Sequence, residues 1–338
     1  MKRIVLTPVI EEYAKDFLTD LKALADKPLD KLENLRDQIT QHNQQYYNYV
    51  DTIIQHYDEI ITAKPDDIST TIARYFSHWV TLNKSVVFQI NIPQVGAAPK
   101  QVKKKFYELV TDALGYDDVQ EQVFPKYIKK MGIKSCVYCN AQYAISAKKG
   151  KTRRSKKYRS TYNIDHYLPK SDHPYLATSF FNLYPACATC NQTKSNKPPL
   201  FELYINPLDP IERRNPFLFN LDKGSFVKYS MSGNSDDLEI KFGTRSGIPS
   251  QEAIDYEKYF HVEKLCENLK DTVEEVIWKY RVYNKAGRKA LYDSYGKLLP
   301  HKSDWNRFVL GNYDKEEDIL KRPLAKLVQD VAKQLGII

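Results

Sequence analysis

The chain has 338 residues, of which 42% are hydrophobic and 28% charged, so it can bury ordinary cores and is not disordered throughout. At about 150 residues per domain, this length predicts two or three domains. No run approaches the ~18 apolar residues that span a bilayer, and Pro8 and Glu11 interrupt the first apolar stretch too early for a secretory signal. We therefore expect a soluble, cytoplasmic protein without a membrane partner.

The positive charge is concentrated in one segment. The net charge is +9, but residues 131–200 alone contain twelve basic and two acidic residues, a balance of +10. Clustering of this kind is typical of proteins that bind a polyanion, most often nucleic acid. The sequence therefore predicts a nucleic-acid partner for this segment.

The hydrophobic pattern predicts three regions, 1–130, 131–200 and 201–338. In the first, apolar periodicity favours helices over 12–26, 31–63, 70–82 and 99–114, with a short strand at 86–88. In the second, stretches 142–147 and 158–164 predict a hairpin around a basic loop, and a short helix follows Cys187. In the third, strands at 217–221, 225–230 and 238–242 suggest a small meander, followed by helices over 250–284 and 285–299 and a last helix opened by Arg322 and Pro323. The fold class is α+β.

Two C-x-x-C pairs lie at the ends of the basic segment: Cys136 with Cys139, and Cys187 with Cys190. Four thiolates suit tetrahedral zinc, whereas disulfides are not expected in an unexported protein. Forty-seven residues separate the pairs, more than in a simple zinc ribbon. A structural zinc would join the two ends of a module whose middle has another task. The alternative is that all four are ordinary core or surface cysteines, as we expect for the isolated Cys266.

The polar residues between and beside these pairs suit phosphodiester hydrolysis. Oxygens of Asp165 and Asn191 are ligands that a hard divalent cation prefers. His166 suits a general base, since an ordinary imidazole is neutral near pH 7. Adjacent residues on a flat strand point to opposite faces, so Asp165 and His166 share a site only at a strand end, or with metal and water on different sides of the phosphate. The sequence leaves both arrangements open.

The basic loop between the two predicted strands is too densely charged for a random solvated surface, and we expect it to contact phosphates. The expected contacts are Lys148, Lys149, Lys151, Arg153, Arg154, Lys156 and Lys157. Lys194 is a further candidate, with solvent exposure as the alternative. His173 is interpreted as a solvated turn residue.

The order C-x-x-C, D-H-x-x-P-K-S, F-N-L, C-x-x-C-N-x-x-K over residues 133–197 resembles the HNH (ββα-metal) endonuclease family in its zinc-bound form. The resemblance implies that Asp165 is the first metal ligand, His166 the general base and Asn182 the central residue that braces the loop and the base. Asn191 then takes the second ligand position, where many members carry His. The family generally cuts DNA with one divalent cation, here Mg²⁺ or Mn²⁺, leaving a 5′-phosphate and a 3′-hydroxyl.

The flanks more loosely resemble bacterial HNH proteins of anti-phage defence, such as the nuclease subunit of Septu-type systems, which works with an ATPase. The features concerned are N-P-L at 206–208, G-N-Y at 311–313 and K-R-P-L-A-K at 321–326. This resemblance implies a defence effector with an ATPase or another subunit as partner, and a homo-oligomer remains open. Two alternatives remain: a non-catalytic zinc-stabilised module that only binds nucleic acid, and an HNH nuclease that cuts RNA.

Overall fold

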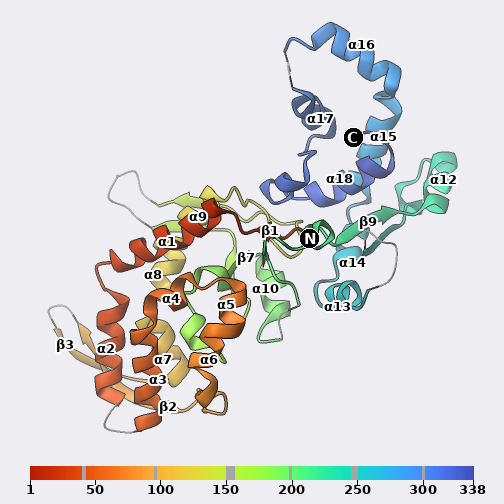
Figure 1. The fold of residues 1–338 in the computed structure, drawn as a ribbon. Coiled ribbons are helices and arrows are strands. Elements are labelled where there is room, and N and C mark those ends of the chain that lie inside the picture. The colour runs from red at the N-terminus through yellow and green to blue at the C-terminus, as the bar shows by residue number, and fades with distance from the viewer. Residues whose placement is uncertain (40–42, 95–96, 150–156, 198–199, 245–249, 299–300) are drawn as a thin grey trace.

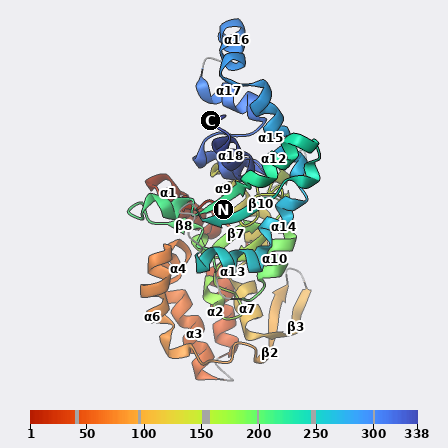
Figure 2. The same cartoon turned by 90° about the vertical axis from the view of Figure 1, so that its right-hand side faces the viewer.

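The computed structural model describes residues 1–39, 43–94, 97–149, 157–197, 200–244, 250–298 and 301–338. The N-terminal helices form one lobe, red and orange in Figure 1, and the last helices form another, in blue. Strand β7 and helix α10 of the middle segment lie between these lobes in both views (Figures 1 and 2). The predicted α+β class is confirmed, because helices dominate and the described residues form five sheets of two strands each.

The N-terminal lobe begins with four helices, α1 (Pro8–Lys22), α2 (Pro28–Ile39), α3 (Gln44–Gln55) and α4 (Tyr57–Thr62). The prediction of a single helix over 31–63 was wrong, because one helix ends and another begins within this range. The Asn43 side chain accepts a hydrogen bond from the Gln45 N–H at 2.9 Å and caps α3. A second break follows at His56, whose backbone leaves helical geometry before α4. The range predicted as a helix over 70–82 is built from short turns: α5 (Pro65–Asp67), η1 (Ile68–Ile72), α6 (Ala73–Tyr75) and η2 (Ser77–Trp79).

Strands β2 (Val87–Gln94) and β3 (Ala97–Lys105) pair as an antiparallel ribbon, where the sequence predicted a short strand and then a helix from residue 99. Helix α7 (Phe106–Ala113) begins only after the ribbon, because the Glu108 carboxylate accepts the Lys105 N–H at 3.0 Å. Phe88 and Ile90 bury the inner face of β2, and the Phe88 ring meets that of Tyr46 at 4.9 Å. Helices α8 (Tyr116–Asp118), η3 (Val119–Val123) and α9 (Phe124–Lys130) lead on to the middle segment.

The predicted hairpin of the middle segment is present in part. Strands β4 (Ser146–Lys148) and β5 (Tyr158–Ser160) pair, but residues 163–166 leave them as β6 (Asn163–His166) and pair with β7 (Leu183–Ala186). Turns η4 (Pro174–Leu176) and η5 (Phe180–Asn182) connect β6 to β7, and the predicted short helix is α10 (Ala188–Lys194). Residues 150–156 of the basic loop lie outside the described residues.

The C-terminal region contains no three-stranded meander within its described residues. Strands β9 (Phe217–Leu221) and β10 (Ile240–Thr244) pair, but the predicted middle strand is α12 (Lys223–Ser232), because Asp222 accepts the Ser225 N–H at 2.8 Å and caps a helix. Strand β8 (Tyr204–Ile205) pairs in parallel with β1 (Ile4–Val5). The remaining helices are α11 (Ile211–Arg214), η6 (Ser235–Asp237), α13 (Gln251–Phe260), α14 (Val262–Glu267), α15 (Lys270–Val282), α16 (Lys285–Tyr295), α17 (Lys302–Leu310), η7 (Glu316–Lys321) and α18 (Ala325–Gln334). Within the described ranges, none of the helices has the length and apolar character needed to cross a bilayer.

Asn140, one residue after the first C-x-x-C pair, ties the C-terminal region to the middle segment. It is 1% exposed, and its side-chain amide donates to Ser135 Oγ at 2.7 Å and to the Ile319 carbonyl at 3.0 Å. Its side-chain oxygen accepts the Lys326 N–H at 2.9 Å. The backbone has φ +53°, a left-handed conformation that Asn tolerates better than most residues. The start of α18 is therefore held against the first cysteine pair.

We predict that Asn140→Gly lowers the free energy of unfolding by about 2–4 kcal/mol, because three buried hydrogen bonds are lost. Asn140→Ala loses the same bonds and adds a strained left-handed Ala, at about 1 kcal/mol more. Urea unfolding followed by circular dichroism measures both variants. Wild-type stability in both, or an Ala variant more stable than the Gly variant, would contradict this role of Asn140.

Candidate functional site

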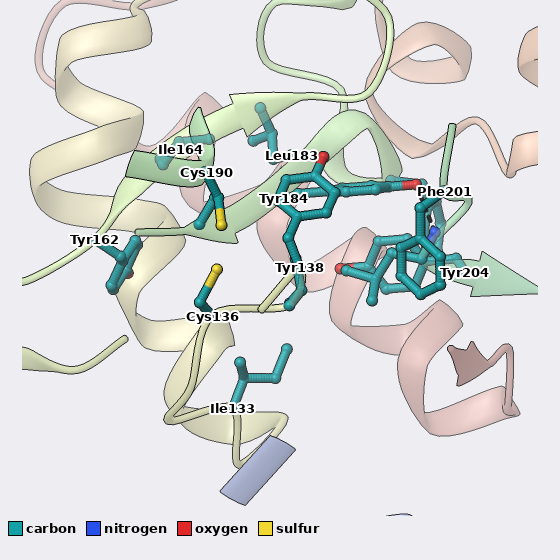
Figure 3. Close-up of a cluster of buried hydrophobic side chains, with 14 of the residues drawn as sticks. Ile133, Cys136, Tyr138, Tyr162, Ile164, Leu183, Tyr184, Cys190, Phe201 and Tyr204 are labelled. Carbon is teal, nitrogen blue, oxygen red and sulfur yellow. Dashed lines mark hydrogen bonds between the residues drawn. The ribbon is translucent and has the colours of Figure 1, made fainter. Parts of the chain in front are cut away.

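The four cysteines of the two C-x-x-C pairs converge on one point. Their Sγ atoms all lie within 4.8 Å of one another, all four residues are buried, and none forms a disulfide. The Sγ atoms of Cys139 and Cys187 are 3.9 Å apart, close to the ~3.8 Å edge of a tetrahedron with Zn–S bonds of ~2.3 Å. Figure 3 shows the Cys136 and Cys190 sulfurs pointing toward each other. The cluster fits a closed structural zinc site.

Backbone N–H groups surround these sulfurs. The Cys187 N–H donates to the Cys136 sulfur at 3.3 Å, and the Ala141 N–H donates to the Cys139 sulfur at 3.4 Å. The Cys190 N–H, in the first turn of α10, donates to the Cys187 sulfur at 3.5 Å. Such donors favour the thiolate, which is the form that binds metal. Three of the four sulfurs thus accept a backbone N–H that favours their thiolate form.

Strand β6 carries Asp165, which is 5% exposed and held by groups from both cysteine pairs. Tyr138, inside the first pair, donates its hydroxyl to Asp165 Oδ2 at 2.5 Å. Lys194, at the end of the helix that the second pair begins, places Nζ 3.4 Å from the carboxylate. Burial raises the pKa of Asp165, and the Lys194 charge and the Tyr138 hydrogen bond oppose that rise. The carboxylate is therefore shielded from solvent, and the Lys194 ammonium compensates its negative charge.

His166, the next residue of β6, is 7% exposed, and its Nε2 lies 3.0 Å from the Ala177 carbonyl oxygen. A carbonyl only accepts, so Nε2 carries the proton and Nδ1 keeps its lone pair. Burial lowers the pKa of His166 to about 3, which leaves the ring neutral at pH 7. The Tyr116 ring lies 5.1 Å from the imidazole, centroid to centroid. The Ala177 hydrogen bond therefore leaves Nδ1 as the ring nitrogen with a lone pair, whereas burial disfavours the protonated ring.

Asn182 fastens the loop between β6 and β7. It is fully buried, and its side-chain oxygen accepts the Leu168 N–H at 2.8 Å. Its amide donates to the carbonyls of Leu168 at 3.2 Å and Leu176 at 3.0 Å. Because Leu176 precedes the residue whose carbonyl meets His166, Asn182 also fixes the surroundings of the imidazole.

Asn191 lies half-buried on α10, one turn before Lys194, and α10 packs against β6. The oxygen donors of Asp165 and Asn191 fit a hard divalent cation. Among the described residues, the four cysteines form the one group of three or more His, Cys, Asp or Glu side chains that could hold a metal. A cation at Asp165 and Asn191 would therefore need water or substrate oxygens to complete its coordination.

The expected substrate contacts divide into three groups. Lys148, Lys149 and Lys157 are exposed at the base of the basic loop, where Lys157 Nζ pairs with Glu121 at 3.0 Å. Lys151, Arg153, Arg154 and Lys156 lie outside the described residues. Lys194 is buried rather than exposed to solvent or phosphate, and its ammonium donates to the His166 carbonyl at 2.6 Å.

Sequence reasoning did not single out Tyr138 or Tyr116. The one available signal for Tyr138 was an aromatic residue inside the first pair, C-V-Y-C. Its ring stacks on Phe260 at 4.5 Å, and Figure 3 places it beside Tyr184. A buried ring at that position brings its hydroxyl to Asp165, a contact between β6 and a turn 27 residues earlier.

Comparison with known proteins identifies the middle segment. Residues 136–197 match the family described as HNH endonuclease, and the match includes both cysteine pairs together with Asp165, His166, Asn182 and Asn191. No curated protein and no solved structure matches the chain. The resemblance of the flanks to anti-phage defence proteins has no counterpart among these results.

We predict that the wild-type protein contains one zinc ion per chain and that Cys136→Ser or Cys190→Ser abolishes it, because three thiolates no longer close the tetrahedron. Cys266→Ser is the matched control, since that buried thiol lies outside the four-cysteine group. Atomic absorption of protein purified without chelators measures the metal. Equal zinc in all variants, or none in wild type, would contradict the assignment.

Proposed function

We propose that the HNH endonuclease domain of residues 136–197 hydrolyses phosphodiester bonds of DNA, with His166 as the general base. The observation that carries the proposal is the orientation of the His166 imidazole, whose Nε2–H is donated to the Ala177 carbonyl, so that Nδ1 is the ring nitrogen that keeps its lone pair. A base of this kind takes a proton from the attacking water. The family match supports the reaction class.

Asp165 and Asn191 are the proposed ligands of one Mg²⁺ or Mn²⁺ ion. When bound, the ion supplies positive charge to the phosphoryl and leaving oxygens. Residues of the chain itself orient the general base. The Ala177 carbonyl holds the His166 ring in one orientation and stabilises the imidazolium that forms, and Asn182 keeps the loop with that carbonyl in place.

The basic loop is the proposed phosphate-binding surface. Lys148, Lys149 and Lys157 supply exposed positive charge at its base, and we assign the same role to Lys151, Arg153, Arg154 and Lys156 from the sequence. Lysine and arginine contacts to phosphate give affinity without sequence preference. Lys194 has a different role in this account, because its buried ammonium compensates the charge of Asp165.

The contact between Lys194 and Asp165 favours one second candidate function, a zinc-stabilised module that binds nucleic acid without cutting it. In that reading the carboxylate is a structural partner of the ammonium and not a metal ligand. Cleavage of RNA stays an alternative that the sequence leaves open, and a role in anti-phage defence with an ATPase or other partner subunit stays a prediction from the resemblance of the flanks.

We predict that wild-type protein with Mg²⁺ or Mn²⁺ nicks supercoiled plasmid and that His166→Ala lowers the rate by about 10²–10⁴-fold, because the general base is lost. His173→Ala is the matched control. It removes a second imidazole, in the loop that follows β6, which contacts the Tyr175 hydroxyl.

Gel analysis of nicked and linear plasmid measures the rates, with an RNA of the same sequence digested in parallel. If wild type and His166→Ala bind DNA equally and both leave DNA and RNA intact in either metal, the binding-only module is correct. If the RNA is digested much faster than the DNA, the substrate is RNA and not DNA.

We also predict that Tyr138→Phe slows nicking about tenfold while zinc content and DNA affinity stay unchanged. The variant removes only the hydroxyl that donates to Asp165, and the ring keeps its stacking on Phe260. Hydrogen bonds to charged groups contribute about 1.5–3 kcal/mol, enough for such a change in rate. An unchanged rate would show that Asp165 does not depend on Tyr138.

A further inference from the structure

The β2–β3 ribbon has one buried face and one exposed face. Cross-strand partners share a face of an antiparallel pair, so Phe88 with Lys104 and Ile90 with Val102 form the face turned to the protein. Phe88 and Ile90 are buried there, and Lys104 Nζ pairs with Asp112 at 2.5 Å. This face anchors the ribbon to the N-terminal lobe, from which it extends at the lower left of Figure 1.

The opposite face carries side chains that donate and accept hydrogen bonds. Its cross-strand partners are Gln89 with Lys103 and Asn91 with Gln101, and all four residues are exposed. Residues 87–105 contain four lysines and no acidic residue. The register places Lys103 and Lys105 on the exposed face, together with three amide side chains on two strands, Gln89, Asn91 and Gln101.

We propose that this ribbon reads the sequence of duplex DNA in the major groove. The inference rests on the proposed function, since it assigns a specificity element to the same nuclease. The major groove of B-DNA admits a two-stranded β-ribbon. Asn and Gln pair in bidentate fashion with the N6 and N7 of adenine, and Lys contacts the O6 and N7 of guanine. The positive charge of the ribbon complements the phosphates on either side of the groove.

A series of packed elements connects the ribbon to His166, the proposed general base. Strand β3 leads directly into α7, α7 packs against η4 of the β6–β7 loop, and α8 follows α7. Tyr116, the first residue of α8, contacts the His166 ring. This packing would fix the distance between a base pair at the ribbon and a phosphate at His166, as cleavage at a fixed offset from a recognised sequence requires.

A simpler role for the lysines is protection of an exposed strand edge against pairing with other chains. That role requires positive charge, whereas base reading requires the amides of Asn91 and Gln101. The Asn91→Ala/Gln101→Ala double variant separates the two roles, because it keeps every lysine and the Gln38 contacts to the Asn91 backbone.

The experiment selects random duplex DNA for binding to full-length protein that carries His166→Ala, so that no cleavage is needed, and sequences the bound pool. We expect an enriched motif of a few base pairs. Asn91→Ala/Gln101→Ala in the same background should lower the preference for that motif about tenfold or more, while the affinity for unselected duplex changes less than about threefold. Lys104→Gln is the matched control, because it removes one charge from the inner face and should keep the motif.

Absence of any enriched motif, or an unchanged motif in the double variant, overturns the proposal. Loss of the motif in Lys104→Gln to the same degree also overturns it, since net charge would then be the cause. The selection is independent of catalysis. If the protein selects a motif but never cuts DNA, the proposed nuclease activity is wrong and base reading by the ribbon is supported. If the protein cuts DNA but selects no motif, the nuclease activity is supported and base reading by the ribbon is wrong.

Discussion

The convergence of four sulfurs is the constraint on which the rest of the middle segment depends. Forty-seven residues separate the two cysteine pairs in the chain, yet their Sγ atoms lie within 4.8 Å. Tyr138 comes from the first pair and Lys194 from the helix begun by the second, and both contact Asp165. Closing the sulfur cluster therefore places two partners around the carboxylate at once. A structural zinc at this cluster would therefore act on the geometry of the proposed catalytic residues without touching the substrate.

The C-terminal region completes this arrangement from outside. The Tyr256 hydroxyl donates to the Tyr138 carbonyl at 2.5 Å, and Asn140 binds the start of α18. Backbone N–H groups of Lys134 and Ser135 both donate to the Leu320 carbonyl, at 2.8 and 3.1 Å. The first cysteine pair is thus held between the second pair and residues about 120–190 positions further along the chain. Buried residues from both sides of residue 200 belong to one packed core. The domain boundary predicted at residue 200 stays a prediction.

The sequence was most informative where chemistry restricts residue type and spacing. Paired cysteines, an Asp-His dipeptide and an Asn after the last cysteine identified the HNH segment, because few other arrangements need all of them. The ribbon was missed because K-Q-V-K-K-K is also a good helix sequence, and pairing with β2 overrode that propensity. The buried position of Lys194 was missed for a related reason. A lysine after a helical turn is usually solvated, and only the fold of β6 against α10 brings a buried carboxylate to it.

The central claim is that a zinc-clamped fold presents the His166 Nδ1 and the oxygens of Asp165 and Asn191 to one phosphodiester. A crystal structure of the full chain with zinc, Mg²⁺ and an uncleavable phosphorothioate duplex tests it most directly. The account predicts a water about 2.6–3.2 Å from His166 Nδ1, in line with a scissile phosphorus whose oxygens share a cation with Asp165. DNA bound with its phosphates remote from residue 166, or an imidazole still enclosed by protein, would contradict it.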